Sequence, residues 1–267
     1  MSGMTTGLIP DYGLEVARGN VSGVSCVNKF GAAPSGIQTT ATDIWDRANA
    51  TPTQQIWLAP TAARIHTIAS TSAADDTGGT GCNSVIVSYL PDWDTAETTE
   101  TVTGNLNGGI AMNNAAVMIH RIKTVPQATT TSVGCNAGTI TATAATDATI
   151  TAVILPNNGQ TEMAIYGIPS TQTAYMTAWR CNIDKTSGAA ASCDFEVRVN
   201  PNPDVQTLAF LRKQDISLQS TGTNMFQTNL EANPMKIVGP AIIKIQGVAS
   251  AADLDGESSF DLYIVNN

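Results

Sequence analysis

Short runs in which apolar and polar residues alternate recur along the chain from about residue 61 to its end. Alternation with a period of two and many β-branched residues is typical of β-strands with one buried face. Turn-forming residues separate the runs. No stretch of ten or more residues has the period of an amphipathic helix. The predicted strands are 62–70, 84–90, 97–103, 115–123, 138–145, 148–155, 162–167, 173–183, 191–199, 206–213, 240–248 and 258–265.

This pattern predicts an all-β protein, an antiparallel β-sandwich or jelly-roll-like fold. A Pro-Asn-Asn-Gly sequence at 156–159 predicts a hairpin turn that separates the strands of 61–155 from those of 156–267. These ranges form either two β domains or one continuous β domain from residue 61. Residues 1–60 contain short apolar pieces between glycines and prolines, which predicts an extended N-terminal arm that packs on a neighbour. Removing residues 1–35 should then leave the β part folded.

One hairpin can be predicted in register. If 173–183 pairs with 191–199 around Gly188, then Cys181 faces Cys193 and Trp179 faces Phe195. Aromatic and β-branched pairs of this kind stabilise neighbouring strands. The two cysteines would lie close enough for a disulfide, although a cytosolic product can keep them reduced.

The composition narrows the range of partners. Only 13% of the residues are charged and the net charge is −9, with scattered lysines and arginines. Binding to a nucleic-acid backbone or an anionic membrane needs clustered positive charge, so neither partner is expected. No apolar run approaches a membrane span, and the N-terminus has no signal-peptide pattern, so we expect the protein to be made in a cytoplasm.

Catalytic chemistry has few candidates. The chain has two histidines, His66 and His120, which we expect at exposed strand positions. No nucleophile elbow, zinc-protease, Walker or dinucleotide motif occurs. Acidic clusters at 92–100 and 253–257 lack the full calcium-loop spacing and are interpreted as solvated turns. We therefore expect no enzyme activity, no metal and no cofactor, although paired carboxylates of a polysaccharide-degrading enzyme would escape a search of the sequence.

Four segments resemble, in the same order along the chain, a family of virion structural proteins of tailed bacteriophages, many of them marine. They are residues 15–31 (EVARGNVSG and, further on, VNKFG), 43–60 (DIWD and IWLAP), 72–81 (SAADDTGGTG) and 158–177 (NGQT, AIY and TAYMT). The chain departs from the family pattern after Val27 and in its five cysteines. The resemblance implies a virion component assembled in the host cytoplasm.

Resemblance and composition together favour a capsid cement or decoration protein that binds the outside of the major capsid protein lattice. A homotrimer would suit the threefold junctions of an icosahedral shell. The arm is expected to make the partner contacts, through Val16, Arg18, Val21, Val27, Lys29 and Phe30. The alternative is a tail or head-fibre component that recognises host carbohydrate, for which Trp93, between two aspartates, is the candidate contact.

Overall fold

A computed structural model describes residues 12–48, 54–125, 135–184, 190–204, 210–222, 224–230, 232–252 and 254–267. Within these ranges the chain is built almost entirely of antiparallel strands, which confirms the predicted all-β class. The helices there are one short α-helix, α1 (Tyr12–Ala17), and two 3₁₀ turns, η1 (Ala73–Asp75) and η2 (Leu106–Gly108). None of the helices in the described ranges is long and apolar enough to cross a membrane.

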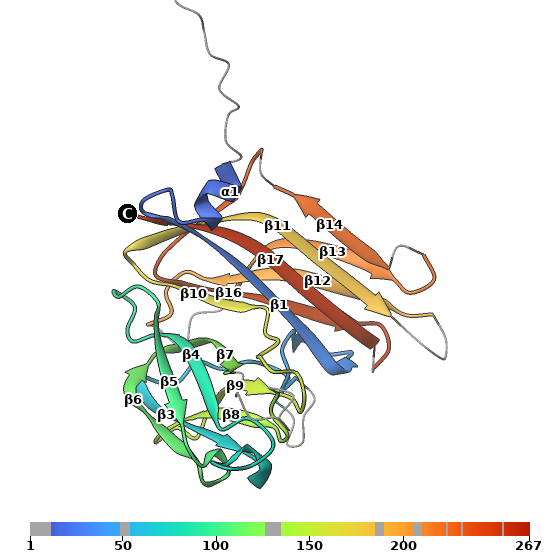
Figure 1. The fold of residues 1–267 in the computed structure, drawn as a ribbon. Helices are drawn as coiled ribbons and strands as arrows, with labels where there is room; N and C mark the ends of the chain where they lie inside the picture. The colour runs from blue at the N-terminus through green and yellow to red at the C-terminus, as the bar shows by residue number, and fades with distance from the viewer. Residues whose placement is uncertain are drawn as a thin grey trace, which may run out of the picture.

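Two larger sheets lie in the upper part of Figure 1. The first sheet has the order β1 (Val24–Ile37), β17 (Leu254–Asn266), β11 (Gln172–Asp184) and β14 (Met225–Asn229), and β15 (Met235–Val238) also pairs with β11. The second sheet has the order β10 (Ile165–Ile168), β16 (Ala241–Ala249), β12 (Ser192–Asn200) and β13 (Leu211–Gln219), and β2 (Thr42–Asp43) also pairs with β16.

Two smaller sheets lie below them in Figure 1. The third sheet has the order β6 (Ile110–Ala116), β3 (Arg64–Ser70), β8 (Ile140–Ala144) and β9 (Ile150–Ile154). The fourth sheet has the order β5 (Thr98–Thr103), β4 (Ser84–Leu90) and β7 (Met118–Thr124). All their strands come from one continuous part of the chain, whereas the two larger sheets combine N-terminal and C-terminal strands.

The first and second sheets pack face to face. Trp179 and Phe260 are cross-strand partners in the first sheet, and both are fully buried, as is Phe195 of the second sheet. The ring of Phe195 approaches so closely that its Cζ would lie 3.3 Å from a Cβ placed on Gly256. Alternate residues of each strand thus fill the space between the sheets, as in a β-sandwich.

The N-terminal segment differs from the expected extended arm. Residues 24–37 form β1, which pairs along its length with β17. Ile37, Ile44 and Trp45 are fully buried in the common hydrophobic core. The pattern hid this strand because Gly31, a proline and a left-handed glycine interrupt its alternation, and the register shifts after Ala33. The domain boundaries predicted at residues 60 and 155 stay predictions.

The predicted hairpin between β11 and β12 is wrong. In the first sheet β11 pairs with β17, β14 and β15, whereas in the second sheet β12 pairs with β13 and β16. Trp179, Cys181, Cys193 and Phe195 are all buried, but Trp179 and Phe195 enter the core from different sheets. Cys181 and Cys193 are both buried free thiols. The two strands have matching alternation because both pack against the same core, and not because they pair with each other.

The turn at 156–159 also joins different sheets. Asn157 and Gly159 have positive φ angles of 67° and 71°, as a tight turn requires. However, β9 before it pairs with β8, and β10 after it pairs with β16. The turn is confirmed, but the hairpin that it was expected to close is not.

Candidate functional site

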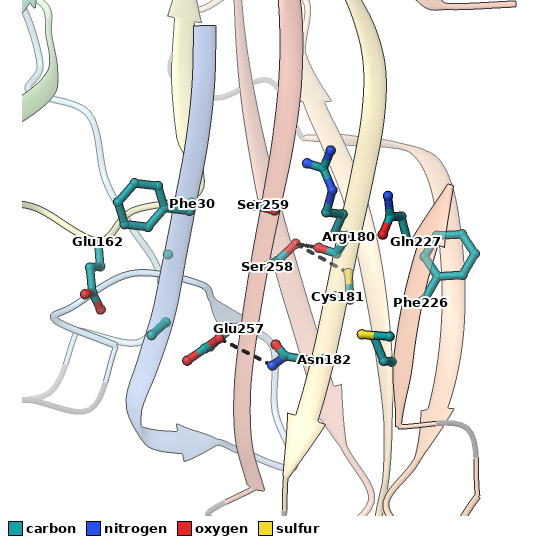
Figure 2. Close-up of a pocket in the computed structure, with 13 residues that line it drawn as sticks. Phe30, Glu162, Arg180, Cys181, Asn182, Phe226, Gln227, Glu257, Ser258 and Ser259 are labelled. Atoms are coloured by element: carbon teal, nitrogen blue, oxygen red, sulfur yellow. Dashed lines mark hydrogen bonds between the residues drawn. The ribbon is translucent and has the colours of Figure 1, made fainter. Parts of the chain in front are cut away.

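The outer face of the first sheet carries a cavity of about 420 Å³. It lies across β1, β17, β11 and β14, strands that are far apart in the sequence and adjacent in the sheet. In Figure 2, Phe30 and Glu162 stand on one side, Phe226 and Gln227 on the other, and Arg180, Asn182, Glu257 and Ser259 between them. We call this surface the outer groove.

Cross-strand pairing sets the polar floor of the outer groove. Arg180 is paired with Ser259 and Asn182 with Glu257 in the ladder between β11 and β17. The Asn182 Nδ2 donates to the Glu257 carboxylate at 3.3 Å. The Arg180 guanidinium forms an ion pair with Asp261 at 2.7 Å, further along the same face. The groove thus presents an amide, a carboxylate and a guanidinium that each have a partner within the sheet.

Cys181, between Arg180 and Asn182 in β11, is buried, and its thiol lies 3.4 Å from the Ser258 hydroxyl. Burial raises the pKa of the Cys181 thiol strongly, and it raises the pKa of the Cys193 thiol to about 12. Both thiols are therefore protonated near neutral pH. Since the thiolate is the reactive form, these cysteines are poor nucleophiles.

The six residues expected to contact a partner are found in several environments. Val16 of α1 and Lys29 of β1 are buried within the fold, and the partner contacts predicted for them stay predictions. Arg18 is exposed and forms an ion pair with Glu15 at 3.0 Å. The remaining three, Val21, Val27 and Phe30, are half-buried.

Of the six, Phe30 alone lines the outer groove. The guanidinium carbon of Arg121 lies 5.7 Å from the centre of its ring. A cation over the face of an aromatic ring is attracted by it. The orientation of Phe30 is therefore set partly from the fourth sheet.

His120 is buried, contrary to the expected exposed strand position. The Gly167 N–H donates to its Nε2 at 3.1 Å, so its proton is on Nδ1, which donates to the Glu97 carboxylate. The ring also stacks on Tyr166, with 4.1 Å between ring centres. Burial lowers the pKa of His120, and the bond to Glu97 opposes that shift only in part. The signal for burial was the apolar run Met118-Ile119 before this histidine.

Burial would raise the pKa of Glu97, but the bond to His120 and the charges of Lys29 and Arg121 outweigh it and lower this pKa. The pair is therefore a neutral imidazole that donates to an ionised carboxylate. The sequence search missed this pair because Glu97, just before β5, and His120, in β7, are far apart in the chain.

His66 is buried as well. Its Nδ1 lies 3.0 Å from the Arg64 carbonyl oxygen, to which it donates, and its Nε2 has no hydrogen-bond partner within the described ranges. Burial lowers the pKa of His66 to about 4. The expected exposed position is wrong here too, and the histidine is neutral at physiological pH.

Trp93, the candidate carbohydrate contact, is only 8% exposed. Its edge lines a cavity of about 280 Å³ together with Pro60, Val117 and Pro203. Both flanking aspartates are engaged, since Asp92 accepts the Asp94 N–H at 2.8 Å and Asp94 accepts the Ser170 hydroxyl at 2.6 Å. The indole does not present the open face on which a sugar ring stacks, which corrects that expectation.

The carboxylates of the acidic cluster at 92–100 bind different partners and do not form a common site. Glu97 bonds to His120, whereas Glu100 holds Asn113 and Asn114 through its two carboxylate oxygens. In the described part of the chain no group of three or more His, Cys, Asp or Glu side chains is arranged to hold a metal ion.

No model of a known protein family matches the chain, and neither does any curated protein sequence. Among solved structures, it aligns with the T13 IBDV viral particle at 7% identity and a TM-score of 0.22, over 91% of this chain and 69% of that chain. It aligns with the infectious bursal disease virus VP2 subviral particle at 9% identity and a TM-score of 0.19, over 91% and 72% of the chains. These similarities to virus capsid proteins are weak, and values this low do not establish a common fold.

Proposed function

We propose that the chain is a virion structural protein of a tailed bacteriophage, without enzyme activity, that binds the outside of the major capsid protein lattice as a cement or decoration protein. The observation that carries the proposal is the outer groove, an open face across four strands that the described part of the chain leaves uncovered. The resemblance of the sequence to phage virion proteins supports it independently.

The side chains of this face suit contact with another protein. At one end, Tyr12 of α1 meets Tyr263 of β17 edge-on, with ring centres 5.9 Å apart, and Tyr175 is the cross-strand partner of Tyr263. Met225, 66% exposed, stands at the side of the groove. Tyrosine, arginine and methionine are enriched where proteins bind each other, because they combine apolar area with hydrogen bonding.

The number of copies in the particle tests the proposal most directly. Quantitative mass spectrometry of purified particles of the encoding phage should give a ratio near one copy per major capsid protein. About a dozen copies per particle would overturn the cement role and indicate a tail or vertex component.

A binding assay with particles that lack the protein tests the outer groove. Met225→Asp places a charge beside the groove and should abolish binding. Leu58→Asp is the matched control, since Leu58 is also exposed (54%) but lies outside the groove. Equal binding by both variants would contradict the assigned face.

The N-terminal contribution needs a shorter deletion than residues 1–35. That deletion would remove most of β1, which pairs with β17, and would leave the first sheet without its edge strand. Deleting residues 1–23 removes α1 and keeps β1. We propose that this variant folds and binds the lattice more weakly, and that the intact chain sediments as a homotrimer.

A further inference from the structure

A second pocket, of about 230 Å³, lies where β1 meets β7. Each strand is the last of its sheet, and the two are joined by side chains: the Arg121 guanidinium donates to the Asn28 carbonyl oxygen at 2.7 Å, and the Lys29 ammonium donates to the His120 carbonyl oxygen. We call it the edge pocket. Its lining residues are Cys26, Val27, Asn28, Lys29, Ser88, Glu97, His120, Arg121, Lys123 and Tyr166.

The edge pocket concentrates positive charge in an acidic protein. Three of the 13 lysines and arginines line it, namely Lys29, Arg121 and Lys123. Within the described ranges none of these three forms an ion pair within 4.0 Å. Six other cations there do: Arg18, Arg64, Arg180, Arg198, Arg212 and Lys244.

The single carboxylate of the edge pocket is already engaged. Glu97 accepts the Nδ1 proton of His120, and His120 is held in that tautomer by the Gly167 N–H at 3.1 Å. The pocket therefore retains a surplus of cations over carboxylates. Burial and the charge of Arg121 lower the pKa of Lys29 to about 7, with Glu97 acting in the opposite direction.

We propose that the edge pocket binds a carboxylate group, recognised by Lys29, Arg121 and Lys123. Arginine and lysine donate strong, charge-assisted hydrogen bonds to carboxylates, and the half-closed setting strengthens them. The carboxylate comes either from an acidic side chain of a partner protein or from a small free acid. This inference concerns the isolated chain and stands apart from the proposed binding to a capsid.

Calorimetric titration of the whole chain with two probes tests it. The probes are succinate and the peptide acetyl-Glu-Asp-Glu-amide, with acetyl-Gln-Asn-Gln-amide as the neutral peptide. Binding of both acidic probes supports a general carboxylate site, the peptide alone supports a protein partner, and succinate alone supports a small acid. Binding of neither acidic probe, or equal binding of the neutral peptide, would overturn the proposal.

Matched variants assign the binding to this pocket. Lys123→Met removes an exposed cation of the pocket and should weaken binding about tenfold, the loss of one charge-assisted contact. Lys213→Met removes an exposed cation of β13, outside the pocket, and should change nothing. Equal affinities of these two variants would overturn the assignment.

Proton uptake reports on Lys29. At pH 8 most of the free protein has an uncharged Lys29, given its pKa of about 7, and a bound carboxylate raises that pKa, so binding should take up protons. The other titratable or charged groups that line the pocket with Lys29 are Cys26, Glu97, His120, Arg121, Lys123 and Tyr166. Titration in two buffers of different ionisation enthalpy measures the uptake. Binding without proton uptake would overturn the role given to Lys29.

Discussion

The Lys244 ammonium lies 2.8 Å from the Asp43 carboxylate, and both side chains are buried. Asp43 also accepts the Trp57 N–H at 2.7 Å and the Gln246 amide at 2.8 Å. One carboxylate thus ties β2 and the loop after it to β16, two hundred residues away in the chain. The N-terminal segment is held into the fold at this point by charge as well as by apolar packing.

Asp43→Asn should destabilise the protein by about 3 to 5 kcal/mol. Removing one partner of a buried ion pair leaves the other charge uncompensated in a medium that solvates it poorly. Here Lys244 is only 4% exposed in its side chain. Urea unfolding followed by tryptophan fluorescence measures the loss.

An exposed ion pair provides the control for this measurement. Asp215 lies 3.9 Å from Arg212, and its side chain is 62% exposed. Surface pairs of this kind contribute about 0 to 1 kcal/mol. If Asp215→Asn and Asp43→Asn have equal effects, the buried bridge has no special role in stability.

Gly31→Ala should destabilise the first sheet. A Cβ at Gly31 would lie 2.6 Å from the backbone nitrogen of Ala164 and 2.6 Å from the carbonyl oxygen of Ile44. Backbone atoms cannot move aside as a side chain can, and overpacking of this kind costs about 1 to 3 kcal/mol.

The control for Gly31→Ala is Gly108→Ala, because nothing lies within 4 Å of a Cβ at Gly108 and its φ is negative. Thermal unfolding of the two variants gives the comparison. A melting temperature that falls no further in Gly31→Ala than in Gly108→Ala would mean that β1 does not pack against these residues as closely as the structure has it.

The sequence identified strands well where alternation was regular. The range predicted for β4, 84–90, coincides with the observed strand, and that for β11 differs by one residue at each end. The sequence pattern could not predict which strands pair, because the same alternation arises whether two residues face each other across a ladder or across the core. Trp179 and Phe195 are buried in the common core from different sheets, whereas the sequence predicted that they pair across one ladder.

The outer groove could not be predicted as a unit. Phe30 was singled out, yet its neighbours in the groove, Arg180 and Glu257, come from strands that only the sheet order brings beside it. The edge pocket was hidden for the same reason, since Lys29 and His120 are joined through a backbone carbonyl. Local sequence patterns predict individual strands. A site that is formed by the edges of several sheets can be predicted only when the order of the strands is known.

Trp93→Ala should lower stability whether or not the protein binds carbohydrate. The indole is 8% exposed and belongs to the hydrophobic core, and removing a buried tryptophan costs about 3 to 5 kcal/mol. Chemical unfolding measures this loss, and Trp93→Phe should recover part of it. If Trp93→Ala is as stable as the wild type but loses glycan binding, the indole is not buried as the structure has it. That result would favour the alternative role in carbohydrate recognition.

Asp46 should make the protein less stable as the pH rises. Its side chain is buried, one oxygen accepts the Glu162 N–H at 3.0 Å, and the other has no partner within the described ranges. Burial raises the pKa of Asp46 to about 8 from its ordinary value of 3.8, opposed by that hydrogen bond and aided by the charge of Glu162.

Between these two pKa values the unfolded chain ionises and the folded chain keeps its proton, so stability is lost as the pH rises from about 4 to about 8. Asp46→Asn cannot ionise and should escape this loss. Its free energy of unfolding relative to the wild type should therefore rise by roughly 2 to 4 kcal/mol between pH 5 and pH 8. Urea unfolding at both pH values measures the difference, and a difference independent of pH would mean that Asp46 is ionised in the folded protein throughout this range.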